Sequence, residues 1–171
     1  MAPPPIWFER KFSFDFPVEL YPTVCMRLRG TPVRAEDLTR GLTRDQLTRK
    51  PEGKWSIQEH VGHLFDLEPL FLTRLEEFRR GAEVLAPADL TNRKTHEARH
   101  NDGSLESLLL ELRRAREKMM DAVDALAPAD FARVAKHPRL NQPMRLVDLL
   151  FFVAEHDDHH LAVVWHLRQS A

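Results

Sequence analysis

The C-terminal segment of the chain combines a helical apolar stripe with two histidines. The apolar members of the stripe recur with helical spacing: Leu149, Val153, Val163, Val164 and Leu167. At about 100° per residue, His156 and His160 lie at the centre of the same face. A buried imidazole without partners costs roughly 1–3 kcal/mol, so both rings need hydrogen-bond partners or a common ligand. Side chains four residues apart on a helix are about 5–6 Å apart at Cβ, so a single metal ion can satisfy both.

Helical periodicity extends over most of the sequence and predicts an all-α protein. Only 6 of the 171 residues are glycine, and the prolines lie largely between periodic segments. We expect four main helices. The first falls within residues 18–42, with an interruption or restart at residues 30–32, where Thr31 can cap a helix that has Pro32 in its first turn. The fourth begins near Pro143 and runs almost to the end of the chain.

The second and third helices have clearer boundaries. The sequence Ser56-Ile-Gln-Glu59 matches a capping box, in which serine and glutamate satisfy each other's backbone donors. We therefore expect the second helix to begin after Ser56 and to end at Gly81, because glycine commonly follows the last helical residue. The third helix is expected from near Ser104 to near Pro128.

Residues 81–103 form a connection much longer than the roughly 2–8 residues typical of neighbouring antiparallel helices. This length permits a crossover, so that the second and third helices run parallel. Two interpretations of the segment are open at this point. It forms a lid over a site, to which His96 and His100 would contribute, or it is a disordered surface segment.

Composition narrows the class of protein. The length favours one domain over residues 1–171, with an irregular N-terminal segment at residues 1–15. Lys and Arg number 25 against 26 Asp and Glu, for a net charge of -1, and without a concentrated basic face nucleic acid is not an expected partner. The single cysteine, Cys25, excludes an intrachain disulfide, and together with the lack of a secretory signal it favours a cytoplasmic location. The most apolar run, residues 149–154, is far shorter than the roughly 20 residues of a membrane helix.

Two histidines of the second expected helix can supply a third metal ligand. On a helical projection His60 lies nearer the centre of the apolar stripe and His63 at its flank, so the spacing favours His60. The run at residues 59–63, EHVGH, also parallels EHDDH at residues 155–159, which would make the pairs 60/63 and 156/159 equivalent.

Three motifs occur in a characteristic order: Trp55-Ser56, His63-Leu64 and His156-Asp-Asp-His-His160. In this order they resemble the DinB-like (YfiT-like) family of small metal-dependent enzymes, over about residues 16–165. The resemblance implies that His63, His156 and His160 bind one divalent metal ion, and on this basis we expect His63 rather than His60. It also implies a four-helix bundle of up-down-down-up topology, consistent with the long second connection.

Three imidazoles without a protein carboxylate leave an open coordination position, as expected of a catalytic ion, and zinc or nickel suits such a nitrogen set. The resemblance implies a metal-dependent transferase that uses a low-molecular-weight thiol, or a hydrolase, acting on a small molecule. The sequence does not choose between them. The alternatives are a non-catalytic metal- or small-ligand-binding stress-response protein and a structural dimerisation module. A homodimer is expected because relatives are often dimeric.

The remaining candidates have weaker claims. His159 is expected beside the ligands or at an interface, and His137 and His166 on the surface or between helices. Glu59 is committed to the helix cap, which reduces its claim to be a general base. Asp157 and Asp158 flank the expected ligand pair, and we expect them to orient imidazole protons, with solvent exposure as the alternative for Asp158.

Overall fold

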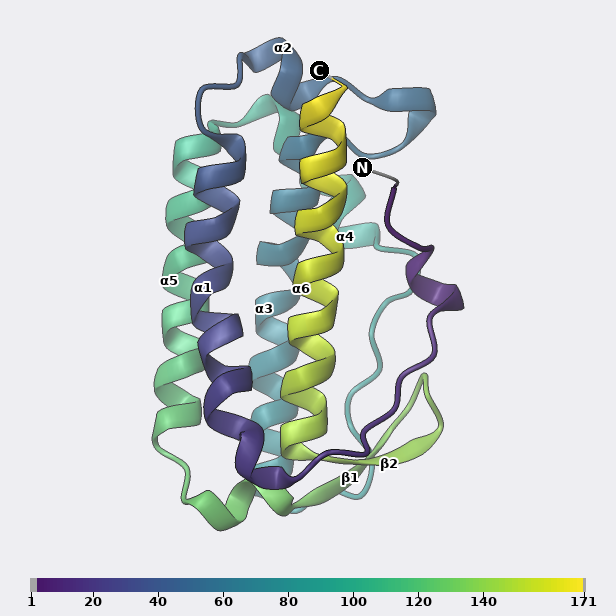
Figure 1. The fold of residues 1–171 in the computed structure, drawn as a ribbon, viewed down its shortest axis with the longest axis vertical. Helices are drawn as coiled ribbons and strands as arrows, with labels where there is room; N and C mark the ends of the chain where they lie inside the picture. Colours follow the sequence, from purple (N-terminus) through teal and green to yellow (C-terminus); the bar gives the residue numbers. More distant parts are fainter. Residues whose placement is uncertain (1–2, 171) are drawn as a thin grey trace.

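A computed structural model describes residues 3–170 of the chain. The four long helices form a bundle (Figure 1): α1 (Tyr21–Thr39), α3 (Ile57–Arg79), α5 (Leu105–Asp124) and α6 (Leu146–Gln169). The shorter elements are α2 (Arg44–Thr48), α4 (Arg93–Glu97) and a hairpin of β1 (Val134–His137) and β2 (Gln142–Arg145). Single 3-10 turns lie at Trp7–Glu9, Val18–Leu20, Pro51–Gly53, His100–Asp102 and Pro128–Ala132.

The bundle has the expected up-down-down-up topology. In Figure 1, α1 runs upward, α3 and α5 both run downward, and α6 returns upward. The connection at residues 80–104 carries the chain back along the bundle and allows α3 and α5 to lie parallel and packed together. It is not a disordered surface segment, since it contains α4 and buries Leu85 and Thr95.

The capping box predicted at Ser56 is present. The Ser56 hydroxyl accepts the Glu59 N–H at 3.1 Å, and the Glu59 carboxylate accepts the Ser56 N–H at 2.9 Å. Two backbone donors at the start of α3 are thereby satisfied, and the helix ends shortly before Gly81, whose φ of +73° suits glycine. This cap fixes the start of the helix that carries His60 and His63.

The expected interruption of the first helix at residues 30–32 is wrong, because α1 continues through Pro32. Proline lacks the N–H that would bond to the carbonyl of Leu28, four residues earlier. The structure supplies another donor: the buried guanidinium of Arg116 on α5 donates to that carbonyl at 2.9 Å. A contact between two helices therefore replaces the missing bond within one helix.

The start of the fourth helix near Pro143 is also displaced, because the hairpin occupies the preceding residues. Each strand has four residues, and β1 alternates exposed and buried positions. The connection after α3 pairs with β1, since the Leu85 N–H donates to the Lys136 carbonyl at 3.0 Å. The hairpin thereby brings the turn at residues 138–141 against the bundle.

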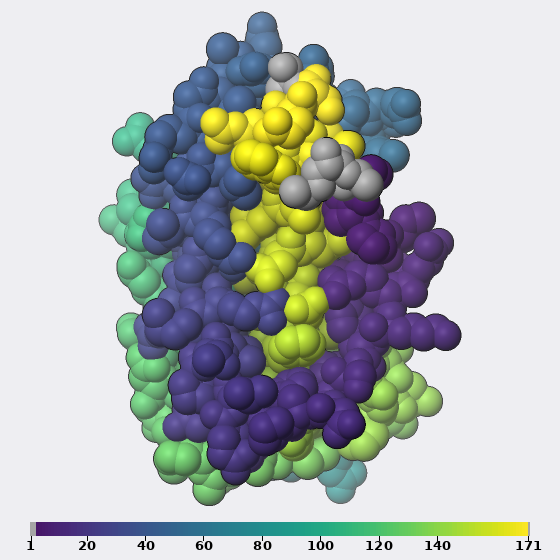
Figure 2. Space-filling model, in the orientation of Figure 1, coloured from purple at the N-terminus to yellow at the C-terminus, as the bar shows by residue number. Residues whose placement is uncertain are grey.

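The N-terminal segment lies along one flank of α6, with α1 along the other (Figure 2). Trp7 is buried there, and its ring centroid lies 5.2 Å from that of Phe152 on α6. Arg10 pairs with Glu155, which fastens the segment to α6. Within residues 3–170, no helix is both long and apolar enough to cross a bilayer.

Candidate metal centre

Three buried histidines converge between α3 and α6. His63, His156 and His160 are only 4–7% exposed, and each offers a ring nitrogen within 4.8 Å of the other two. The Nε2 atoms of His156 and His160 lie 3.1 Å apart. Two nitrogens at about 2.0–2.1 Å from a tetrahedral ion would be separated by about 3.3 Å, so this pair suits one ion with little movement.

In two of the three rings, the nitrogen that faces away from the cluster has a protein partner. Nδ1 of His63 lies 3.0 Å from the hydroxyl of Thr95 on α4, and Nδ1 of His160 lies 2.9 Å from Nδ1 of His60. These contacts leave Nε2 of His63 and His160 for the cluster. Nδ1 of His156 finds no hydrogen-bond partner among the described residues. Three buried imidazoles whose nitrogens converge in this way fit metal ligands better than core packing residues.

Burial keeps these imidazoles neutral. Desolvation lowers the pKa of His60 to about 3 and that of His63 to about 4. It also lowers the pKa of His156 and His160 well below the ordinary value of 6.5. Metal ligation requires the neutral ring, so at neutral pH the cluster already has the protonation state of a metal site.

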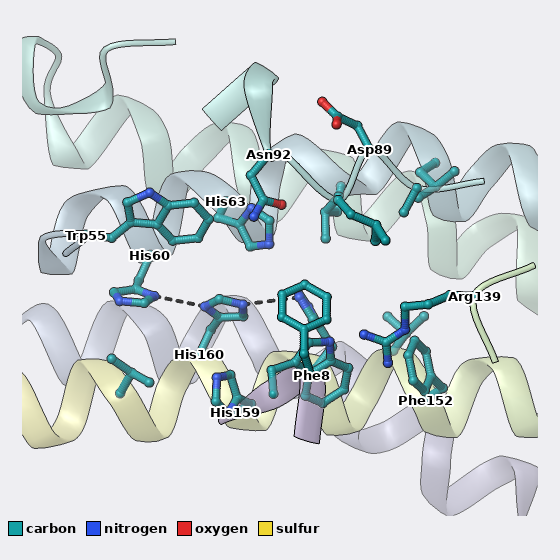
Figure 3. Close-up of a pocket in the computed structure, with 18 of the residues that line it drawn as sticks. Phe8, Trp55, His60, His63, Asp89, Asn92, Arg139, Phe152, His159 and His160 are labelled. Carbon is teal, nitrogen blue, oxygen red and sulfur yellow. Dashed lines mark hydrogen bonds between the residues drawn. The ribbon is translucent and has the colours of Figure 1, made fainter. Parts of the chain in front are cut away.

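A pocket of about 630 Å³ opens beside the histidines (Figure 3). His60, His160 and Trp55 lie at one end of the view, and Phe152 and Arg139 at the other. Much of the wall between them is apolar: Trp7, Phe8, Leu67, Leu70, Phe71 and Val153. The arrangement can hold a small molecule against an ion bound by the three histidines and shield it from water.

The other histidines differ in where they lie relative to the cluster and the pocket. His60 lies behind His160 rather than in the cluster, so the residue favoured by periodicity alone is a neighbour of a candidate ligand. His159 is half-buried and lines the pocket, and exposed His96 also borders it. His100 is turned away, with Nε2 2.8 Å from the Asp66 carboxylate.

The structure bears on two expectations about individual residues. His137 is not on the surface but buried on β1, and it lies between two helices: its Nε2 is 3.2 Å from Nη1 of Arg74 on α3, and its ring centroid is 5.2 Å from that of Phe152 on α6. Asp157 does not orient an imidazole, because its carboxylate accepts from Thr31 at 2.8 Å and from Arg116 at 2.7 Å. As expected, Glu59 is committed to the cap of α3, where it also pairs with Lys50 at 2.6 Å.

Thr95, Arg74 and Arg139 lie at the site but were not expected there from the sequence. Thr95 belongs to a five-residue helix in a long connection, and Arg139 lies on a turn, so neither falls in a periodic pattern. Arg74 lies in α3 and is 2% exposed, although arginine is seldom so deeply buried. No signal in a single sequence distinguishes these side chains from ordinary polar residues.

The bundle topology and the histidine cluster between α3 and α6 define a helical-bundle protein with a candidate mononuclear metal site. The family model of the DinB superfamily matches residues 27–164, which include all three histidines, and the chain belongs to this superfamily. Among curated proteins, the uncharacterized protein YuaE of Bacillus subtilis (strain 168) is 27% identical over 144 residues, covering 77% of this chain and 88% of YuaE.

Two solved structures share the fold. YfiT from Bacillus subtilis, described as a probable metal-dependent hydrolase with an unusual four-helix bundle topology, superposes with a TM-score of 0.80 at 19% identity, covering 95% of this chain and 93% of YfiT. A mycothiol-dependent maleylpyruvate isomerase superposes with a TM-score of 0.67 at 12% identity, and the match spans 88% of this chain and 61% of the isomerase. The expected family and bundle topology are therefore confirmed.

Proposed function

We propose that the protein binds one divalent metal ion through His63, His156 and His160 and uses it in a reaction on a small molecule. The observation that carries this proposal is the convergence of three buried, neutral imidazoles within 4.8 Å of one another at the wall of a pocket. Zinc or nickel suits this nitrogen set. A homodimer and a cytoplasmic location belong to the same proposal.

The protein's own residues prepare the site for this role. A divalent ion held by three imidazoles would supply a Lewis acid with an open position for a small-molecule group. Thr95 and His60 hold the outer nitrogens of two rings and thereby fix which nitrogen faces the cluster. Trp7 and Phe152, packed together beside His156, exclude water from one side of the pocket.

Two reactions suit such a centre: hydrolysis of a small molecule, and transfer of a low-molecular-weight thiol. The description of YfiT as a probable metal-dependent hydrolase supports the first. The mycothiol dependence of the structurally similar isomerase supports the second. A panel of esters and of electrophilic thiol acceptors, assayed with and without added metal, distinguishes them. A metal-loaded protein that turns over neither panel would favour the non-catalytic alternative, a metal- or small-ligand-binding stress-response protein.

Metal analysis of protein purified without a His-tag tests the site itself. We expect about one ion per chain in the wild type, and loss of that ion in the His156→Ala, His160→Ala double variant. His63→Ala should also lose the ion, whereas His166→Ala should retain it. His60→Ala should weaken binding without changing the stoichiometry, because His60 contacts His160 rather than the cluster. Full occupancy in the double variant would overturn the proposal.

A further inference from the structure

Two guanidinium groups line the pocket at the end away from Trp55 and His60. Arg139 lies on the turn between β1 and β2, and Figure 3 shows its side chain directed into the pocket beside Phe152. Arg74, on α3, is 2% exposed and donates from Nη1 to Nε2 of His137 at 3.2 Å. This end of the pocket is therefore cationic, whereas the walls between it and the histidines are largely apolar.

Neither guanidinium forms an ion pair with a carboxylate among residues 3–170. The charge of Glu77 acts on Arg74, but its carboxylate accepts from the Ala86 N–H at 2.7 Å and pairs with Arg80. Arg74 donates only to the Ala86 carbonyl, from Nε at 2.9 Å and Nη2 at 2.8 Å, and to His137. Within the same described part of the chain, Arg139 donates no hydrogen bond. The carboxylate of Asp89, which also borders the pocket, instead accepts from the backbone N–H groups of Thr91 and Arg93.

The surroundings of Arg139 hold its guanidinium in place without neutralising it. Its Cζ lies 5.6 Å from the ring centroid of Trp7 and 5.3 Å from those of Phe8 and Phe152. Cation–π attraction offsets part of the desolvation but leaves all five N–H donors free. Burial lowers the pKa of Arg139 and lowers that of Arg74 to about 10, and at Arg74 the nearby charge of Glu77 offsets this effect only in part. An anion at this position would neutralise the charge of the Arg139 guanidinium and accept hydrogen bonds from its N–H groups.

The spacing along α6 sets the size of the molecule. Phe152, His156 and His160 follow one another every four residues, which corresponds to about 6 Å of helix axis per step. Because Arg139 packs on Phe152, its guanidinium lies about one step along the helix from His156. A body of about this length, such as one aromatic ring, can lie against the apolar walls of the pocket.

We propose that Arg139, supported by Arg74, binds the carboxylate of a small apolar organic acid whose body lies along the pocket toward the histidines. The planar fork of a guanidinium matches a carboxylate and can donate two parallel hydrogen bonds to it. This inference rests on the proposed function, because it assigns the substrate class of the pocket beside the metal centre. Arg139 is thus a specificity-determining residue.

Calorimetric titration of the chelator-treated, full-length protein tests the inference without the metal. The probe is 3-phenylpropionate, and its neutral match is 3-phenylpropan-1-ol. The wild type should bind the acid at least about tenfold more tightly than the alcohol, because hydrogen bonds to a charged partner are involved. Arg139→Gln should remove this preference and leave the affinity for the alcohol unchanged. Arg139→Lys should keep part of the preference, because it keeps the charge without the fork.

Arg114→Gln is the matched control, since Arg114 is exposed on α5 and does not line the pocket. This variant should bind the acid like the wild type, and unchanged circular dichroism of Arg139→Gln should show that it is folded. Equal binding of acid and alcohol by the wild type, or an unaltered preference in Arg139→Gln, would overturn the inference. These titrations contain no metal, so a negative result would count against carboxylate binding by Arg139 and not against the metal site. Conversely, if the protein were found not to bind metal, the titrations would still test carboxylate binding.

Discussion

At the scale of single residues, the geometry of the cluster depends on side chains one contact away from it. The hydroxyl of Thr95 holds Nδ1 of His63 at 3.0 Å, and this contact reaches α3 from the connection between α3 and α5. Such outer partners fix the tautomer and the orientation of a ligating imidazole. The connection therefore contributes to the candidate metal site without supplying a ligand.

Replacing Thr95 by valine should lower the affinity for the metal by about tenfold or more, because outer partners of ligating histidines contribute factors of roughly 10–100. Valine has nearly the shape of threonine, so packing is preserved while the hydrogen bond is lost. Competition against a chromophoric chelator measures the change. Thr91→Val is the control, since that exposed hydroxyl bonds only to Asp89. Equal affinities in the two variants would show that Thr95 does not orient His63.

The same residues show what the sequence could predict about the site. His156 and His160 follow from their position on an apolar stripe, and the structure buries both. The choice between His60 and His63 depended on the resemblance, because both are buried and periodicity reports only the direction of burial. What separates them is a tertiary contact: Thr95 approaches His63, whereas His60 meets His160.

At the scale of elements, the connection between α3 and α5 is seated on α3 by a close contact at Gly62. A methyl group at this position would overlap the imidazole of His100. That imidazole bonds to Asp66 at 2.8 Å, and the Gln58 amide donates to the His100 carbonyl at 2.6 Å. The glycine is therefore needed for space rather than for backbone conformation, and it permits the connection to close over the histidines.

Gly62→Ala should release this connection and, through Thr95, weaken metal binding by about tenfold. Limited proteolysis should then cleave residues 81–103 faster than in the wild type. Gly30→Ala on α1 is the matched control, because its nearest neighbour, Nε of Arg34, lies 3.7 Å from the added methyl. There alanine should stabilise the helix by about 0.5–1 kcal/mol. A stabilised Gly62→Ala with intact metal affinity would show that the connection does not depend on this contact.

The elements that the sequence did not predict depend on distant partners. The hairpin strands are only four residues long, too short for alternation to stand out, and β1 is also held by the connection after α3. The continuity of α1 through Pro32 depends on Arg116, 84 positions further along the chain. By contrast, the capped start of α3 was predictable because Ser56 and Glu59 exchange both capping hydrogen bonds within four residues of the chain.

At the scale of the whole molecule, one buried ion network joins the four long helices. Arg116 of α5 bonds to Glu68 of α3 at 2.5 Å, to Asp157 of α6 at 2.7 Å and to the Leu28 carbonyl of α1. Removing one member of a buried network leaves an uncompensated charge, so the network fixes how the helices meet. Asp157 directly follows His156, and the network therefore also holds the position of α6 that carries the candidate ligands.

Several buried histidines make the stability of the whole fold depend on pH. The pKa is lowered from 6.5 to about 4 for His137 and His63 and to about 3 for His60, mainly by desolvation. The unfolded chain then binds more protons than the folded protein between about pH 6.5 and pH 4. Stability is fully present above pH 6.5 and is lost as the pH falls through this window, by up to about 1.4 kcal/mol per pH unit for each group.

Thermal melts of the chelator-treated protein at pH 7.5, 6 and 5 should show this loss. His137→Asn should flatten the dependence, because protonation of His137 breaks the hydrogen bond that its Nε2 accepts from Arg74 and places two positive charges side by side, and asparagine does not titrate. A pH profile as steep as that of the wild type would contradict this role.

Added metal should raise the melting temperature at pH 7.5, since an ion that binds only the folded state stabilises it by mass action. The increase should shrink as the pH falls toward 5, because protons and metal compete for the same imidazole nitrogens. Circular dichroism should show that the metal-free protein is still helical at pH 7.5, because the apolar faces of all four long helices remain packed. The control is the His156→Ala, His160→Ala double variant, in which metal should cause no shift at any pH. If melts with metal and with chelator coincide for a wild type that is shown to bind the ion, then metal binding is not coupled to folding.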